Sequence, residues 1–262
     1  MSNNVLDATP LDVHDQGMNR KTALVTGANR PLGLGFAVAR QLAEQDHHVI
    51  LTARDLRQAD DRASELRRAG LSATAARLDL ADRASIREAA DRLAQTVGHL
   101  DVLVNNASHG PDFRTRSALD VDLDALHATF EVDVFGCWAL ILALLPLLRR
   151  APAARIVNVS SVAAQQIGKP GVAVVFSPAH SLAKHTLNVL TTTLAAALAD
   201  TPIRVNAVDP GSIASHPERG DDEDDRPAAE AAWGVIWAAT LDAGGPTGRL
   251  FLDGQPVEAA PQ

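Results

Sequence analysis

The chain has 262 residues, of which 46% are hydrophobic, and a formal net charge of −8 at pH 7. This length and apolar content suit one α/β domain, and the acidic charge argues against a general nucleic-acid surface. Cys137 is the only cysteine, so an internal disulfide is excluded and a reducing, cytoplasmic setting is expected.

Polar residues without periodicity fill the first segment, Met1–Arg20, so we expect a flexible tail there and no signal peptide. The domain is expected to span Lys21–Val257, and residues 258–262 to form a second tail. The longest apolar run, Val134–Leu148, contains Gly136 and Pro146. It is predicted to be a buried core helix, too short to cross a membrane.

A strand, a glycine turn and a helix are predicted in succession from Lys21 to Arg40. The apolar run Ala23–Val25 precedes the turn Gly27-Ala-Asn-Arg-Pro-Leu-Gly33-Leu-Gly35, and apolar residues then recur at helical spacing from Phe36. This order is typical of a dinucleotide fold, in which the start of the helix points free N–H groups at a pyrophosphate. A tight turn that merely packs a helix on a sheet would show the same pattern.

Arg54 follows the second predicted strand, His48–Thr52. An acidic residue at this place holds the ribose hydroxyls of NAD(H), whereas an arginine accommodates the 2′-phosphate of NADP(H). Arg54, together with Arg30 in the glycine turn, therefore predicts NADP(H). The alternative is that both are solvated surface arginines.

The remaining predicted elements alternate. Helices are expected at Leu56–Ala69, Arg83–Val97, from Asp120 or Asp122 to Arg150, Pro178–Ala199 and Ala228–Ala239, and strands at Ala73–Leu78, Leu100–Val104, Arg155–Val159, Ile203–Val208 and Arg249–Leu252. Such alternation predicts a Rossmann-like, doubly wound parallel sheet in a three-layer single domain. Ligands of such sheets bind outside the carboxyl ends of the strands, where Gly27, Arg54, Asp79 and Asn105 fall. The acidic run within Ser212–Arg226 predicts a mobile lid.

Several motifs resemble those of the short-chain dehydrogenase/reductase family, of the single-domain type. They are TGANRPLG (Thr26–Gly33), LDL (Leu78–Leu80), NNAS (Asn105–Ser108), NVSS (Asn158–Ser161), HSLAK (His180–Lys184) and NAVDPG (Asn206–Gly211). The resemblance runs from Thr22 to about Val257 and implies a nicotinamide cofactor and reversible hydride transfer to a carbonyl. It implies these cofactor-binding residues, with no metal site: Gly27, Asn29, Arg30, Leu32, Gly33, Arg54, Asp79, Leu80, Asn105, Ala107, Lys184, Pro210 and Gly211.

The family's mechanism uses a tyrosine as acid/base, a lysine, a serine and an asparagine. Ser161 and Lys184 match, but His180 takes the place of the tyrosine, and the chain contains no tyrosine. Asp133 stands at the asparagine position, and Pro31 and Ser108 stand where the family has glycines. Pro31 weakens the cofactor prediction, because proline lacks an N–H and fixes φ close to the phosphates.

Ser161, His180, Lys184 and Asp133 form the predicted catalytic set. His180 and Lys184 would share one face of a helix. The ammonium of Lys184 disfavours a second positive charge, so His180 is expected to be neutral. Asp133, if it reaches Lys184, would pair with it and restore some proton-donating capacity to His180.

Three functions are compatible with these residues. The first is an NADP(H)-dependent carbonyl/alcohol oxidoreductase acting on a small organic substrate, with His180 as acid/base; the retained cofactor residues favour it. The second is a non-redox isomerase, dehydratase or cyclase in which Ser161 and His180 move protons, favoured by Pro31 and the missing tyrosine. The third is a catalytically silent binding subunit.

Two long predicted helices indicate a homodimer or homotetramer. Together these helices carry more apolar surface than one face of the sheet can cover, so part of it is expected to pack against another copy of the chain. The residues concerned are Phe135, Trp138, Leu142 and Leu145 on one helix and Leu187, Leu190 and Leu194 on the other. No membrane or nucleic-acid partner is expected.

Overall fold

The computed structural model describes residues 20–167, 174–214 and 225–257. The tail predicted for residues 1–20 lies outside the described residues except for Arg20. Residues 215–224 of the predicted acidic lid and the tail 258–262 also lie outside them.

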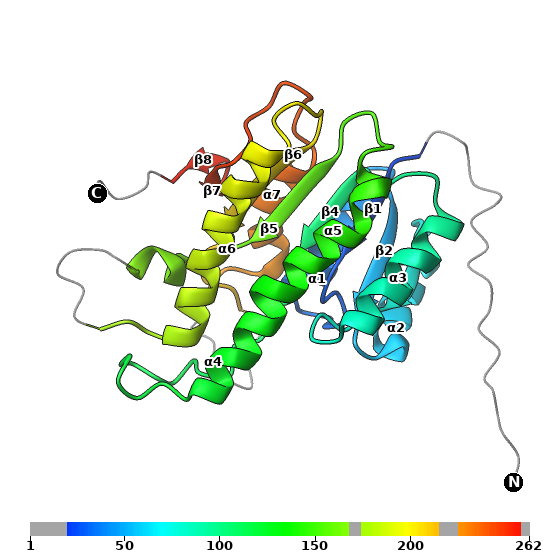
Figure 1. Cartoon of the computed structure of the whole chain (residues 1–262). Coiled ribbons are helices and arrows are strands. Elements are labelled where there is room, and N and C mark those ends of the chain that lie inside the picture. Colours follow the sequence, from blue (N-terminus) through cyan, green and yellow to red (C-terminus); the bar gives the residue numbers. More distant parts are fainter. Residues whose placement is uncertain (1–19, 168–173, 215–224, 258–262) are drawn as a thin grey trace, which may run out of the picture.

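An eight-stranded sheet forms the middle layer, in the order β3-β2-β1-β4-β5-β6-β7-β8 (Figure 1). The neighbours from β3 to β7 pair in parallel, and β8 is antiparallel to β7. This confirms the predicted doubly wound sheet, whose chain order reverses between β1 and β4, where ligand clefts open in such folds. The strands are β1 (Thr22–Val25), β2 (His48–Ala53), β3 (Ala73–Arg77), β4 (Val102–Asn105), β5 (Arg155–Val159), β6 (Arg204–Asp209), β7 (Leu250–Leu252) and β8 (Gln255–Pro256).

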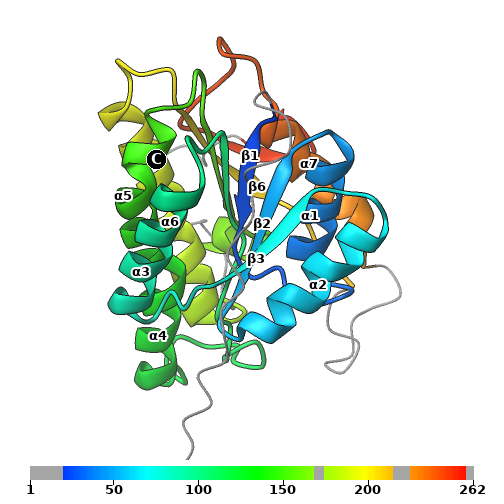
Figure 2. The same cartoon turned by 90° about the vertical axis from the view of Figure 1, so that its right-hand side faces the viewer.

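Helices cover both faces of the sheet, which gives the three predicted layers (Figure 2). One face carries α1 (Leu34–Glu44), α2 (Leu56–Arg68) and α7 (Ala228–Ala239), and the other carries α3 (Arg83–Thr96), α4 (Leu123–Phe130), α5 (Cys137–Leu148) and α6 (Pro178–Ala197). A separate buried apolar cluster lies on each face. Because the strands are covered on both sides, all residues of β1, β4 and β5 are buried, and most of them are apolar.

The predicted helix from Asp120 or Asp122 onward begins at Asp122, whose carboxylate accepts hydrogen bonds from the N–H groups of Asp124 and Ala125. Between α4 and α5 it passes through a π-helical turn, η1 (Glu131–Gly136). Gly136 packs so closely on Leu80 that a Cβ would collide with the Leu80 carbonyl oxygen. Such turns are frequent at functional sites, and this one carries Asp133.

By length and composition alone, the helix Leu123–Leu148 could cross a membrane, since its most apolar window has a mean hydropathy of 1.9. The apolar run Val134–Leu148, predicted to be a buried helix too short to cross a membrane, is the second part of this longer helix. Half of that window is buried inside the fold, and a single helix of this kind is weak evidence for a membrane span.

The prediction that the leucines of the second long helix are left uncovered for assembly is wrong. Leu187, Leu190 and Leu194 are only 1%, 6% and 8% exposed, because they form the face of α6 that packs on the sheet. The exposed apolar side chains of α6 are instead Leu182 and Val189.

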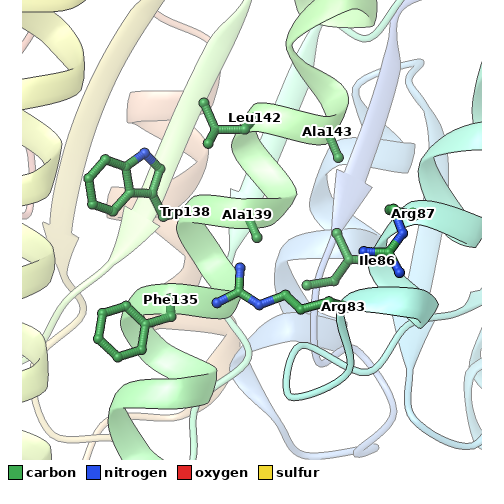
Figure 3. Close-up of a pocket in the computed structure, with 8 residues that line it drawn as sticks. All are labelled: Arg83, Ile86, Arg87, Phe135, Trp138, Ala139, Leu142 and Ala143. Carbon is green, nitrogen blue, oxygen red and sulfur yellow. The ribbon is translucent and has the colours of Figure 1, made fainter.

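On α5 the exposed apolar residues are largely those predicted. Phe135, at the end of η1, and Trp138 and Leu142 are exposed, while Leu145 is half-buried. Phe135, Trp138 and Leu142 face a groove of about 470 Å³ between α3 and α5, into which Arg83 extends from α3 (Figure 3). The groove is lined by Arg83, Ile86, Arg87, Phe135, Trp138, Ala139, Leu142 and Ala143.

Two short elements were not predicted. A 3₁₀ helix, η2 (Val162–Gln166), lies in the segment expected to be irregular, and Ser161 caps it. Strand β8 folds back on β7 through Asp253 and Gly254, which have φ of 47° and 69°.

Candidate active site

A cleft of about 1230 Å³ opens at the carboxyl ends of the parallel strands. It reaches from the glycine turn at one end to the start of α6 at the other, so residues far apart in the sequence line a single space. The predicted site residues that line it are Gly27, Asn29, Arg30, Gly33, Arg54, Asp79, Leu80, Ala107, Ser161, His180, Lys184, Pro210 and Gly211.

Leu32, Asn105 and Asp133 are the predicted site residues that do not line the cleft. Leu32 is 64% exposed on the outside of the glycine turn. Asn105 is buried beneath the site, where its Nδ2 donates to Asn158 Oδ1 at 2.8 Å and Asn158 donates in turn to Thr191. Asn105 is therefore placed to hold the ends of β4 and β5 together rather than to touch a ligand with its side chain.

The glycine turn is packed so tightly that side chains would not fit at two positions. Gly27 has a φ of +67°, and a Cβ there would lie 2.8 Å from the Cα of Ala107. A Cβ on Gly35 would lie 2.7 Å from the Gly27 carbonyl oxygen. Thr26 Oγ1 holds the segment after β4 against this turn by accepting hydrogen bonds from the N–H groups of Asn106 and Ala107, both at 2.9 Å.

Helix α1 starts at this turn with no capping side chain, so its first N–H groups are available to a ligand. Pro31 takes the second position of a four-residue turn that the Gly33 N–H closes by donating to the Arg30 carbonyl at 3.0 Å. Proline is favoured at that position because its φ is already set. The residues present, including Pro31, therefore fit a bound dinucleotide.

Lys184 is buried at the end of the cleft formed by α6. Its Nζ lies 3.1 Å from Asp133 Oδ2 and donates to the Val159 carbonyl at 2.9 Å. Asp133 also accepts from the Ser108 hydroxyl at 2.5 Å and from the His109 N–H at 2.7 Å. Asp133 thus reaches Lys184, and two residues that depart from the family pattern, Ser108 and Asp133, are bonded to each other.

His180 lies one helical turn before Lys184 on α6 and also lines the cleft. Its Nδ1 is buried without a hydrogen-bond partner, whereas Nε2 is not among the buried atoms. Burial and the charge of Lys184 lower the pKa of His180 to about 4, against the opposing effect of Asp133 and Asp112. The imidazole is therefore neutral at pH 7, in line with the expectation from the sequence.

Ser161 has its hydroxyl oxygen turned to the backbone, where it accepts from the Ala163 N–H at 3.2 Å. The hydroxyl proton remains available to a ligand oxygen. Asp209, at the end of β6, is 1% exposed and accepts hydrogen bonds from Gln165 Nε2 and from the Gly211 N–H, both at 2.9 Å. These bonds tie the end of β6 to η2 and so hold Ser161 in place, a role that no sequence motif indicated.

Asp112 is a second buried carboxylate that the sequence analysis missed. It lines the cleft, is 5% exposed, and accepts a hydrogen bond from the Ala179 N–H at 2.7 Å through Oδ2. Its Oδ1 has no partner. No motif could have found it, because its contact with α6 depends on the path of the loop that follows β4.

Across the described ranges, no group of three or more His, Cys, Asp and Glu side chains is placed to hold a metal ion.

Comparisons with known proteins found relatives in both sequence and structure. The family model for short chain dehydrogenases matches residues 21–226. The oxidoreductase UcpA of Salmonella typhimurium is 34% identical over 194 residues, which cover 74% of this chain and 69% of UcpA. Carbonyl reductase (NADPH) 1 of Bos taurus is 41% identical over 140 residues, 53% of this chain and 48% of the relative. The solved RhlG/NADP active-site complex of Pseudomonas aeruginosa superposes with a TM-score of 0.75 at 28% identity, covering 90% of this chain and 95% of RhlG.

The bond between Ser108 and Asp133 can be tested by a double-mutant cycle with Ser108→Ala and Asp133→Asn. We expect a coupling free energy of about 1–3 kcal/mol, because the hydroxyl donates to a charged group that it shares with Lys184. Urea unfolding of the two single variants and the double variant measures it. Ser108→Ala combined with Asp120→Asn, an exposed carboxylate in the same loop, is the control and should be additive within about 0.5 kcal/mol. Equal additivity in both cycles would contradict the bond.

Proposed function

The chain belongs to the short-chain dehydrogenase family, and we propose that it is an NADP(H)-dependent oxidoreductase that interconverts a carbonyl and an alcohol on a small organic molecule. The observation that carries the proposal is the continuity of the cleft. One space joins the glycine turn and Arg54 to Ser161, His180 and Lys184.

The cofactor, when bound, supplies or accepts the hydride. The free N–H groups at the start of α1 would hold its pyrophosphate, and Arg30 and Arg54 would hold the 2′-phosphate. Both arginines line the cleft beside the turn. The names of the bovine carbonyl reductase and of the RhlG/NADP complex add support for NADP(H).

At the other end, Ser161 would donate its hydroxyl proton to the substrate oxygen and orient it. His180 would exchange a proton with that oxygen through Nε2, the nitrogen that is not buried. Lys184 would keep a positive charge near the developing alkoxide, and Asp133 would hold the ammonium in place.

A non-redox proton-transfer enzyme on the same fold is the second candidate. The missing tyrosine and the neutral His180 favour it, because neutral imidazole is a better base than phenol near neutral pH. Turnover by nucleotide-free protein, with no NADPH consumed per product, would select this candidate and reject the first.

The exposed apolar groove between α3 and α5 supports a homodimer or homotetramer as the working assembly. The cytoplasmic setting stays a prediction; the one cysteine, Cys137, is a buried free thiol, which is compatible with a reducing compartment.

Arg54→Asp tests the cofactor preference. If Arg54 contacts the 2′-phosphate, wild-type protein should bind NADPH more tightly than NADH by at least about 1.5 kcal/mol, the contribution of one charge-assisted hydrogen bond. Arg54→Asp should reverse this preference in calorimetric titrations. Arg68→Asp, at the far end of α2 and away from the cleft, is the matched control and should leave it unchanged. Equal affinity of wild-type protein for both nucleotides would refute the assignment.

Substitutions of His180 separate the two candidate functions. In an oxidoreductase, His180→Tyr should retain or improve NADPH-dependent reduction, since phenol beside lysine is the family arrangement, and His180→Ala should lower turnover about 10²–10⁴-fold. In a non-redox enzyme, His180→Tyr should damage activity. His185→Ala, on the same helix but outside the cleft, serves as control. Unchanged turnover in His180→Ala would remove His180 from either mechanism.

Leu142→Glu tests the assembly. Leu142 is 55% exposed in the groove, so a buried carboxylate there should disfavour association of two copies while leaving the fold of each intact. Sedimentation velocity at micromolar concentration should show a dimer or tetramer for the wild type and a smaller species for the variant. A wild-type monomer would contradict the proposal.

A further inference from the structure

A neutral imidazole carries its one proton on either Nδ1 or Nε2, and the hydrogen bond made by one nitrogen decides the state of the other. Only Nε2 of His180 is available to the cleft, because Nδ1 is buried. For Nε2 to accept a proton from an alcohol, the proton already present must sit on Nδ1. A buried Nδ1–H in turn needs an acceptor.

The described residues offer one candidate for that acceptor. Asp112 is bonded through Oδ2 to the N–H of Ala179, the residue directly before His180, so its carboxylate is anchored beside the same turn of α6. Its Oδ1 and the Nδ1 of His180 are both buried and both without a partner. The two unpartnered atoms belong to residues that line the same end of the cleft.

The loop also leaves room beside the imidazole. Gly110, two residues before Asp112, has no side chain, and a Cβ there would lie 3.7 Å from His180 Nδ1. The backbone of the loop that carries Asp112 therefore passes close to this nitrogen.

We propose that Asp112 is the positioning partner of His180: a small reorientation of the two neighbouring side chains lets its Oδ1 accept a hydrogen bond from Nδ1–H, and this bond leaves Nε2 unprotonated and facing the substrate. One carboxylate then has two tasks. Oδ2 holds the loop after β4 on the start of α6, and Oδ1 selects the tautomer.

The charges around the imidazole are consistent with this role. Lys184 on α6 disfavours the imidazolium, while Asp133 on η1 and Asp112 on the loop favour it. Asp133 is already paired with Lys184 and bonded to Ser108, whereas Asp112 has one carboxylate oxygen without a hydrogen-bond partner. The pKa of about 4 belongs to an imidazole whose Nδ1 has no acceptor. A bond to Asp112 would raise the pKa, because it stabilises the charged form, and would thereby make His180 a more effective proton donor in the direction of carbonyl reduction.

Imidazole ¹⁵N chemical shifts of the wild-type protein test the tautomer directly, with His180→Gln used to assign the signal among the nine histidines. At neutral pH we expect His180 as the Nδ1–H tautomer, with an unprotonated Nε2. A predominant Nε2–H tautomer would overturn the proposal, and this readout depends neither on cofactor nor on turnover.

Asp112→Asn provides the second arm. An asparagine oxygen can still accept from the Ala179 N–H, since Asn and Asp are comparable at helix starts. Its NH₂ group would then face Nδ1 and force the proton onto Nε2. We therefore expect the opposite tautomer, a melting temperature close to that of the wild type, and turnover lower by about 10²–10⁴-fold, as when the carboxylate of a Ser-His-Asp triad becomes an amide. The KM for NADPH should not change, because Asp112 is placed at the catalytic end.

Asp120→Asn is the matched control and should alter neither tautomer nor turnover, because Asp120 is an exposed carboxylate later in the loop. An unchanged His180 tautomer in Asp112→Asn, or turnover equal to that of the wild type, would overturn the proposal. The expected loss of turnover rests on the proposed function, but the tautomer does not. A wild-type Nδ1–H tautomer that is lost in Asp112→Asn, in a protein that never oxidises NADPH, would reject the proposed function and leave the pairing of Asp112 with His180 standing.

Discussion

The candidate site is organised around one buried positive charge. Lys184 is 2% exposed, and an ammonium at that depth is tolerated only if it is paired and hydrogen-bonded. Asp133 supplies the countercharge and the Val159 carbonyl a further acceptor. Removing one partner of such a buried pair typically costs about 3–5 kcal/mol, a large part of the stability of an ordinary domain. The position of Asp133 is therefore a constraint on the fold as well as on the chemistry.

That constraint explains local features that look unrelated in the sequence. Asp133 lies in the π-helical turn between α4 and α5, and Gly136 in the same turn lets the chain pack directly on the backbone of Leu80. Ser108 and the His109 N–H complete the hydrogen bonds of the carboxylate from the end of β4. Ser108 and Asp133, the two residues expected to differ from the family pattern at this place, thus form one hydrogen-bonded arrangement.

Much of the fold could be predicted because the buried parallel strands are short, mainly apolar runs and the helices between them have an apolar face. The strand Arg155–Val159 and the helix Ala228–Ala239 match to the residue. Strand β8 was missed although Asp253-Gly254 is a strong hairpin signal, because so short a strand has too few residues to show alternation. The burial of Leu187, Leu190 and Leu194 was missed for a different reason: apolar spacing on a helix identifies an apolar face but not what covers it.

In the candidate site, too, the sequence predicted where residues lie along the chain but not which residues they contact. Motifs predicted the residues that follow each strand, because the topology of a parallel sheet brings all carboxyl ends to one edge. Asp112, Asp209 and the bond between Ser108 and Asp133 could not be predicted, since they depend on the paths of loops and on which way a side chain turns. Pro31 could be judged only in the structure, where it completes a local turn and leaves the start of α1 free. The residues expected to differ from the family pattern therefore lie in two separate parts of the structure. Pro31 lies within a hydrogen-bonded turn at the start of α1, whereas Ser108, Asp133 and His180 all lie around Lys184. Ser108, Asp133 and His180 thus form one group at the Lys184 end of the cleft, whereas Pro31 stands apart from them in the glycine turn.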